Sequence, residues 1–173
     1  IGDVGKYKVN ILKKKINQIN KKIKVKTYRV KAEDKNLGKI LKQYDVIVDG
    51  TDNFKAKFLL NKFSLKYKKK LIIGAISKFE GHIFTFDFSL KKSPCLKCFY
   101  QGEPAEGVLD CETDGILGST AVITGSLQAN EVLKTILNVG KNLNSHILII
   151  DLLNLKFRKV LFRKRKGCIC ENI

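Results

Sequence analysis

The chain has 173 residues, enough to bury the core of one folded domain. Hydrophobic residues make up 44% of the chain and charged residues 29%, which excludes an intrinsically disordered protein. No apolar run is as long as a membrane span, and the start has no signal-peptide pattern, so we expect a soluble cytoplasmic protein with no membrane partner.

The formal net charge is +18, and it has two interpretations. A basic face can bind nucleic acid, but arginine, which base and phosphate recognition prefer, occurs only four times. The lysines are spread along the chain, and we favour a solvated surface over a nucleic-acid-binding face. Such a surface would still steer a small acidic protein partner.

The chain contains no methionine and begins abruptly at Ile1. Either a native start was removed or the chain is the C-terminal part of a longer protein. We favour the second interpretation, because the opening residues show no helix-capping residue and no strand.

In the first half of the chain, hydrophobic periodicity predicts helices alternating with strands. A continuous apolar strand that ends at Asp49 and Gly50 is typical of a buried parallel strand. The expected helices are residues 5–20, 35–43 and 54–70, and the expected strands are 23–30, 44–50 and 71–77.

The second half favours an antiparallel sheet. Residues 81–88 alternate like a half-exposed antiparallel strand, and an irregular segment follows over about 89–115. A long helix from about Gly118 is expected to end near Gly140, before strands over 146–151 and 155–162. Together the two halves predict one α/β domain with a mixed sheet.

The sequence "VIVDGTDN" places Asp49, Asp52 and Asn53 at the carboxyl end of a predicted strand, just before a helix. Ligands bind at such positions in parallel sheets, and a carboxylate there can hold Mg²⁺ that bridges nucleotide phosphates. The alternative is that Asp52 or Asn53 only caps the helix from Phe54.

Cysteines form two pairs and leave one residue over. Cys95 and Cys98 have the spacing of zinc ligands, and Cys168 and Cys170 form a tighter C-x-C pair near the end of the chain. Ordinary reduced cysteines are the alternative for both pairs. Cys111 lies in a polar loop before the long helix, where it is either a nucleophile with a lowered pKa or an unremarkable loop residue.

Several segments, in this order, resemble the MoeB/ThiF (HesA/MoeB/ThiF) family of adenylyltransferases, which are bacterial relatives of ubiquitin-activating enzymes. The resemblance covers essentially the whole chain. The segments are "DVGKYKV", "YDVIVDGTDNFKAKFLLN", "LIIGAISKFEGHIFTF", "SPCLKC", "CETDGILGS" and "GSLQANEVLKTIL".

The resemblance implies a Rossmann-like mixed sheet flanked by helices, in a single partial domain over 1–173 with a crossover loop at about 89–115 and a cysteine tail over 166–173. It implies that ATP and Mg²⁺ adenylate the C-terminal glycine of a small ubiquitin-like sulfur carrier, MoaD in molybdopterin synthesis or ThiS in thiamine synthesis. A sulfur donor such as a cysteine desulfurase or rhodanese then forms a thiocarboxylate. Family members are usually homodimers.

The resemblance also assigns site residues. Asp52 matches the essential aspartate that faces Mg²⁺ and nucleotide, next to Asn53 of the same motif, and Lys8 matches the lysine that contacts the ATP phosphates. Cys111 matches a crossover-loop cysteine that takes up the activated carrier or a persulfide in some members. The four remaining cysteines match structural zinc ligands: Cys95, Cys98, Cys168 and Cys170.

The chain departs from the family pattern in two places. The glycine-rich nucleotide loop, the acidic residue for the ribose and the phosphate-clamping arginines would precede "DVGKYKV", so we expect the C-terminal two-thirds of an enzyme, N-terminally truncated and poor at binding ATP alone. The tail has C-x-C where relatives have C-x-x-C. A non-catalytic scaffold that binds the carrier is therefore the alternative function, and a lysine-rich nucleic-acid-binding domain is the third.

Overall fold

The computed structural model describes residues 2–102 and 115–171, and the chain divides into two compact units. The small unit spans Ile1–Ala32 and the large unit spans Glu33–Ile173. Among the described residues, no helix combines the length and the apolar character that crossing a membrane requires.

The small unit contains one helix, α1 (Lys8–Ile19), inside the predicted range 5–20. The strand predicted over 23–30 is wrong, because residues 24–29 have no regular secondary structure. Alternating hydrophobicity describes one apolar face, but a strand also needs a hydrogen-bonded neighbour. Within the described residues, no strand pairs with 23–30.

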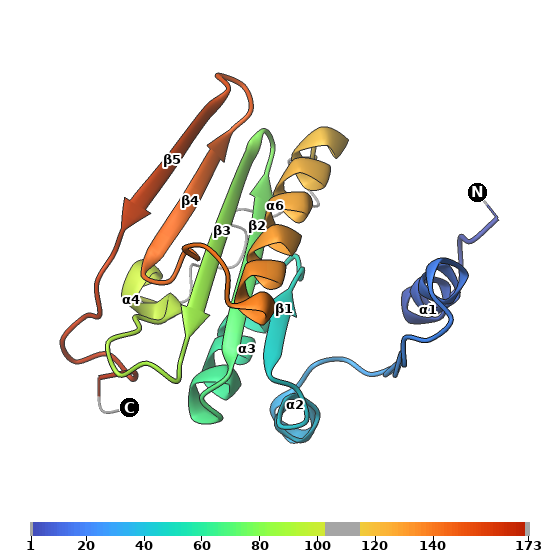
Figure 1. Cartoon of the computed structure of the whole chain (residues 1–173), viewed down its shortest axis with the longest axis horizontal. Coiled ribbons are helices and arrows are strands. Elements are labelled where there is room, and N and C mark those ends of the chain that lie inside the picture. The colour runs from blue at the N-terminus through green and yellow to red at the C-terminus, as the bar shows by residue number, and fades with distance from the viewer. Residues whose placement is uncertain (1, 103–114, 172–173) are drawn as a thin grey trace. The chain divides into compact units, whose positions relative to one another are not determined.

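The large unit is built on a five-stranded sheet with the order β1-β2-β3-β4-β5 (Figure 1). β1 and β2 are parallel, and each later pair is antiparallel, which confirms the predicted mixed sheet. The strands are β1 (Val46–Asp49), β2 (Lys70–Ser77), β3 (Glu80–Asp87), β4 (His146–Asp151) and β5 (Lys156–Leu161).

Helices cover both faces of this sheet (Figure 1). α3 (Phe54–Lys66) and α4 (Leu96–Tyr100) lie on one face, with α2 (Asp34–Leu41) packed on α3. α6 (Gly118–Leu137) lies along the other face and contacts β2 and β3. The short helix α4 falls inside the segment that the sequence predicted to be irregular.

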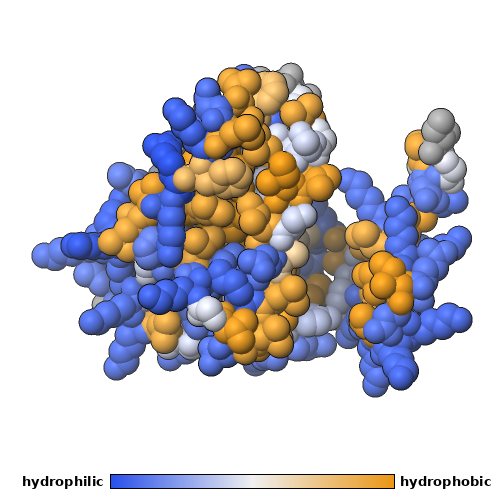
Figure 2. Space-filling view, turned by 45° about the horizontal axis from the view of Figure 1, so that its top comes forward, coloured by the Kyte–Doolittle hydropathy of each residue, from blue (hydrophilic) through white to orange (hydrophobic). Residues whose placement is uncertain are grey.

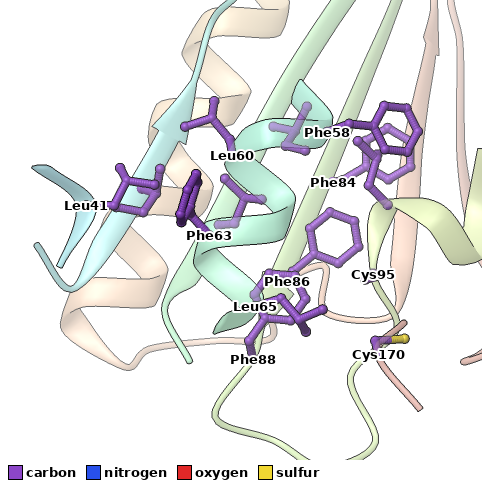
Figure 3. Close-up of a cluster of buried hydrophobic side chains, with 14 of the residues drawn as sticks. Leu41, Phe58, Leu60, Phe63, Leu65, Phe84, Phe86, Phe88, Cys95 and Cys170 are labelled. Carbon is purple, nitrogen blue, oxygen red and sulfur yellow. The ribbon is translucent and has the colours of Figure 1, made fainter. Parts of the chain in front are cut away.

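The larger core cluster fills the space between the sheet and α3 (Figure 3). Phe84, Phe86 and Phe88 form a row along β3 and just beyond it, with consecutive ring centroids 6.0 and 5.6 Å apart. The prediction that this strand is half exposed is wrong. β3 lies in the middle of the sheet with a helix over each face, so side chains on both of its faces are buried.

Helix α6 turns polar side chains towards the sheet. Its buried residues are Thr120, Thr124, Gln128, Glu131 and Thr135. Glu131 accepts hydrogen bonds from Thr85 Oγ1 at 3.0 Å and from the backbone N–H of Leu143 at 2.8 Å, which satisfies a buried carboxylate.

The opposite side of α6 is apolar and exposed. Its large exposed side chains include Val122, Leu133, Ile136 and Leu137. In the space-filling view, apolar side chains gather on the face of the large unit that carries α6 (Figure 2). The helix ends at Leu137, earlier than the predicted stop at Gly140, because Asn138 takes a left-handed conformation with φ of 53°.

Candidate functional site

A pocket of about 280 Å³ lies where the ladder between β1 and β2 stops. The last register pair is Asp49 with Ile73, and β2 continues beyond it to Ser77 while paired to β3. The walls come from the turn after β1, the end of β2, the start of β3 and helices α3, α4 and α6. The pocket therefore occupies the carboxyl edge of the parallel strands, where the sequence predicted a ligand site.

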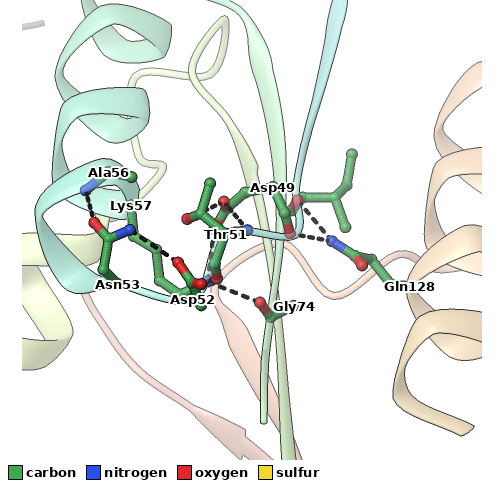
Figure 4. A network of polar contacts seen from close by, with 9 residues as sticks. Asp49, Thr51, Asp52, Asn53, Ala56, Lys57, Gly74 and Gln128 are labelled. Atoms are coloured by element: carbon green, nitrogen blue, oxygen red, sulfur yellow. Dashed lines mark hydrogen bonds and ion pairs between the residues drawn. The ribbon is translucent and has the colours of Figure 1, made fainter. Parts of the chain in front are cut away.

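Asp52 and Asn53 both line this pocket. Asn53 is the N-cap of α3, and its side chain accepts a hydrogen bond from the backbone N–H of Ala56 at 2.8 Å. Asp52 is exposed, and its Oδ1 accepts a hydrogen bond from Asn53 Nδ2 at 3.0 Å (Figure 4). The capping function thus falls to Asn53, and the Asp52 carboxylate stands at the wall of the pocket.

A buried ion pair lies directly beneath this turn. Asp49 and Lys57 are both almost fully buried, and Lys57 Nζ lies 2.9 Å from Asp49 Oδ2 (Figure 4). From the other face of the sheet, Gln128 Nε2 donates to the backbone oxygen of Asp49 at 2.7 Å and to that of Ile72 at 3.2 Å.

Sequence reasoning missed both Lys57 and Gln128. Lys57 is one lysine in a lysine-rich helix. The only signal of its burial in the sequence was its position, one turn after the N-cap and next to the apolar Phe58. Gln128 is a polar residue in the middle of an apolar helix, and helix periodicity alone does not show which side faces the sheet.

His82 and Tyr100 form part of another wall of the pocket. Burial lowers the pKa of His82, and this effect outweighs the opposing charge of Glu80, whose carboxylate lies 4.0 Å from the ring. Burial also raises the pKa of Tyr100, whose ring meets that of Phe54 edge-on at 5.1 Å. This wall therefore favours the neutral forms of both side chains.

The four paired cysteines come together in a second site. All four Sγ atoms lie within 4.8 Å of one another. A tetrahedral zinc ion with Zn–S bonds of about 2.3 Å places its sulfur atoms roughly 3.8 Å apart. The close pairs here are 95–98 at 4.0 Å, 95–168 at 3.6 Å and 98–170 at 3.4 Å. The donor set fits a tetrahedral metal ion, and the tight C-x-C spacing brings both tail cysteines within reach.

The environment of the cysteine cluster shifts the pKa values of its thiols in different directions. Burial, reinforced by the neighbouring thiols, raises the pKa of Cys95 to about 12 and also raises that of Cys170. Burial acts to raise the pKa of Cys168 too, but hydrogen bonds from the Cys170 backbone and nearby thiols outweigh it, so this pKa is lowered. The backbone N–H of Arg165 also donates to Cys98 Sγ at 3.3 Å.

Helix α4 connects the two sites. Cys95 is its N-cap and Cys98 lies within it, whereas Tyr100 at its end lines the pocket. Two further residues were predicted from the sequence. Lys8 belongs to the small unit, where it is exposed at the first residue of α1, and Cys111 lies outside the described residues.

Comparison with known proteins identifies the family of the chain. The ThiF family model matches residues 1–171. The sulfur carrier protein adenylyltransferase of Thermus thermophilus is 34% identical over 170 residues, which cover 96% of this chain and 63% of that protein. A probable molybdopterin-synthase adenylyltransferase of Gracilaria tenuistipitata is 36% identical over 157 residues, covering 91% of this chain and 44% of that protein.

Solved structures share the fold. E. coli MccB with MccA-N7isoASN superimposes with a TM-score of 0.80 at 18% identity, covering 99% of this chain and 53% of that chain. The chain thus spans 63% and 44% of the length of these two relatives and 53% of the length of MccB. The family match over almost every residue confirms the family that the sequence motifs indicated. The chain belongs to the ThiF family.

Proposed function

We propose that the protein adenylates the C-terminal carboxylate of a small ubiquitin-like sulfur carrier. The observation that carries the proposal is the exposed Asp52 carboxylate at the wall of a pocket at the carboxyl edge of β1 and β2. Two relatives that match most of this chain are named as adenylyltransferases, one of a sulfur carrier and one of molybdopterin synthase.

The reaction needs charge stabilisation more than proton transfer. A carboxylate oxygen of the carrier attacks the α-phosphorus of ATP, the bond to the bridging oxygen breaks, and pyrophosphate leaves. The attacking carboxylate is already ionised at neutral pH, so no general base is required. Mg²⁺, when bound, would offset the charge on the phosphates. Asp52 would hold it beside Asn53, and Lys8 would contact the phosphates.

Small residues line part of the pocket. They are Gly74 and Ala75 of β2 and Ala121 and Gly125 of α6. An added Cβ at Gly125 would meet nothing within 4 Å, so this wall has open space where a side chain would otherwise stand. A carrier tail that ends in glycine has no side chain at its last residue, and we expect it to fit beside these small residues.

The other parts of the proposal follow from the family. The cysteine cluster would hold a structural Zn²⁺ that fixes α4 and the tail of the chain. Cys111 would react with the activated carrier or with a persulfide sulfur supplied by a cysteine desulfurase or rhodanese. The exposed apolar side of α6 is compatible with a homodimer, and the basic surface would steer an acidic carrier.

The test is ATP–pyrophosphate exchange by the full-length protein with MoaD-like and ThiS-like carriers. Exchange that needs one of these carriers supports the proposal and identifies the pathway. Asp52→Asn should abolish exchange, whereas Asp45→Asn, which changes a fully exposed aspartate just before β1, should leave it intact. Carrier binding without exchange would instead support the non-catalytic scaffold.

A further inference from the structure

Lys57 is a buried ammonium group whose donors are all used within the protein. Nζ donates to Asp49 Oδ2 at 2.9 Å, to the backbone oxygen of Thr51 at 2.7 Å and to that of Gly74 at 2.9 Å (Figure 4). An ammonium group has three N–H donors, and here three acceptors lie at hydrogen-bonding distance. Lys57 lines the pocket, but it has no donor left for a phosphate group.

These bonds join three segments at the point that precedes Asp52. Asp49 ends β1, Thr51 lies in the turn after it, and Gly74 belongs to β2. Asp49 Oδ1 accepts at the same time from the backbone N–H of Thr51 at 2.9 Å and from its hydroxyl at 2.7 Å. The path of the backbone into Asp52 is therefore fixed by one buried cation and its carboxylate partner.

A buried ion pair is a poor device for stability alone. Removing two charges from water is costly, and well-packed apolar residues often replace such a pair without loss of stability. An apolar pair makes no directed hydrogen bonds, so it could not hold the backbone oxygens of Thr51 and Gly74 in a defined arrangement. The directed hydrogen bonds of Lys57 therefore indicate that it fixes the conformation of the turn after β1.

We propose that Lys57 is a positioning residue, whose ammonium group holds the turn 49–51 against β2 and thereby places the Asp52 carboxylate for binding a divalent cation. The link to the cation rests on the proposed adenylation, whereas the effect on the turn does not. Lys57 acts through Asp49, Thr51 and the backbone, and it need not touch substrate.

The experiment uses the full-length protein with Lys57→Met, Asp49→Asn and the double variant. Lys62→Met is the matched control, because Lys62 lies on the same helix but is exposed and pairs with Asp34. Three quantities are measured: the Tm, the rate of amide hydrogen exchange in the peptide spanning 49–53, and the Mg²⁺ concentration that gives half-maximal ATP–pyrophosphate exchange.

Lys57→Met should lower the Tm, because it leaves the Asp49 carboxylate buried without its partner. The double variant removes both charges and should recover most of the Tm. It should still show faster amide exchange over 49–53 and a half-maximal Mg²⁺ concentration raised roughly 10-fold to 100-fold, as for other groups that orient a metal ligand. The Lys62→Met control should match the wild type in all three quantities.

The inference would be overturned if the double variant matched the wild type in all three quantities: the Tm, the amide exchange over 49–53 and the Mg²⁺ dependence. If the double variant does not fold, Asp49→Asn decides the question. It keeps the Lys57 bonds to Thr51 and Gly74, so it should shift the Mg²⁺ dependence less than Lys57→Met does, and an equal shift would overturn the inference. A wild-type protein without pyrophosphate exchange would refute the proposed function. Amide exchange over 49–53 would then still show whether Lys57 fixes the turn.

Discussion

Replacing Gln128 with leucine should destabilise the large unit and loosen the end of β1. The Gln128 amide is the only described side-chain donor to the backbone oxygen of Asp49. It also packs against Gly74, where an added Cβ would lie 2.7 Å from Gln128 Oε1. Gln128→Leu removes the bonds to Asp49 and Ile72 and leaves a buried carbonyl without its amide partner.

The expected loss follows from these contacts. A typical buried hydrogen bond contributes about 1 kcal/mol, and an unsatisfied buried carbonyl costs about 1–3 kcal/mol, so the loss should be about 2–4 kcal/mol. For a unit of this size, that corresponds to a fall in Tm on the order of 10 °C.

The assay is thermal and urea unfolding of the wild type, Gln128→Leu and a control on the same helix. Asn130→Ala serves as the control, because Asn130 is exposed and its change should alter stability by less than about 0.5 kcal/mol. A Gln128→Leu variant as stable as this control would refute the view that α6 supports the site through Gln128.

Three further predictions concern other parts of the large unit. Asn53→Ala removes the N-cap bond to Ala56 and should cost about 1 kcal/mol in urea unfolding, and an unchanged unfolding midpoint would contradict it. Because burial lowers the folded pKa of His82 below 6.5, the wild type should lose stability as the pH falls through 6.5 and below. His82→Gln should flatten this part of the stability profile, and an unchanged slope would speak against it. Metal analysis should find zinc equimolar with the chain, and Cys98→Ser should lower both zinc content and Tm, whereas a zinc-free stable wild type would disprove the metal site.

Local patterns in the sequence were sufficient for several parts of the fold. A short apolar run ended by Asp49 and Gly50 identified β1, and the spacing of hydrophobic residues identified α3 and α6. The two cysteine motifs indicated a shared site, because thiols in two short motifs are typical ligands of one metal ion. Each of these patterns lies within a short stretch of the chain: one strand, one helix or one cysteine pair.

The errors and omissions depend on residues that are distant in the chain. The strand expected over 23–30 has the right alternation but no described partner. β3 is buried on both faces because α4 and α6 pack over it, which its own sequence does not encode. Lys57 resembles the surface lysines around it until Gly74 and Asp49 are brought beside it by the parallel pairing of β1 and β2.

The most direct test of the central claim is to trap the activated carrier. The full-length protein is incubated with ATP, Mg²⁺, hydroxylamine and a MoaD-like or ThiS-like carrier, and the C-terminal peptide of the carrier is analysed by mass spectrometry. An acyl-adenylate reacts with hydroxylamine, so we expect a hydroxamate at the C-terminal glycine, dependent on ATP and lost in Asp52→Asn. Carriers that bind the protein but keep an unmodified carboxylate would contradict the proposed adenylation.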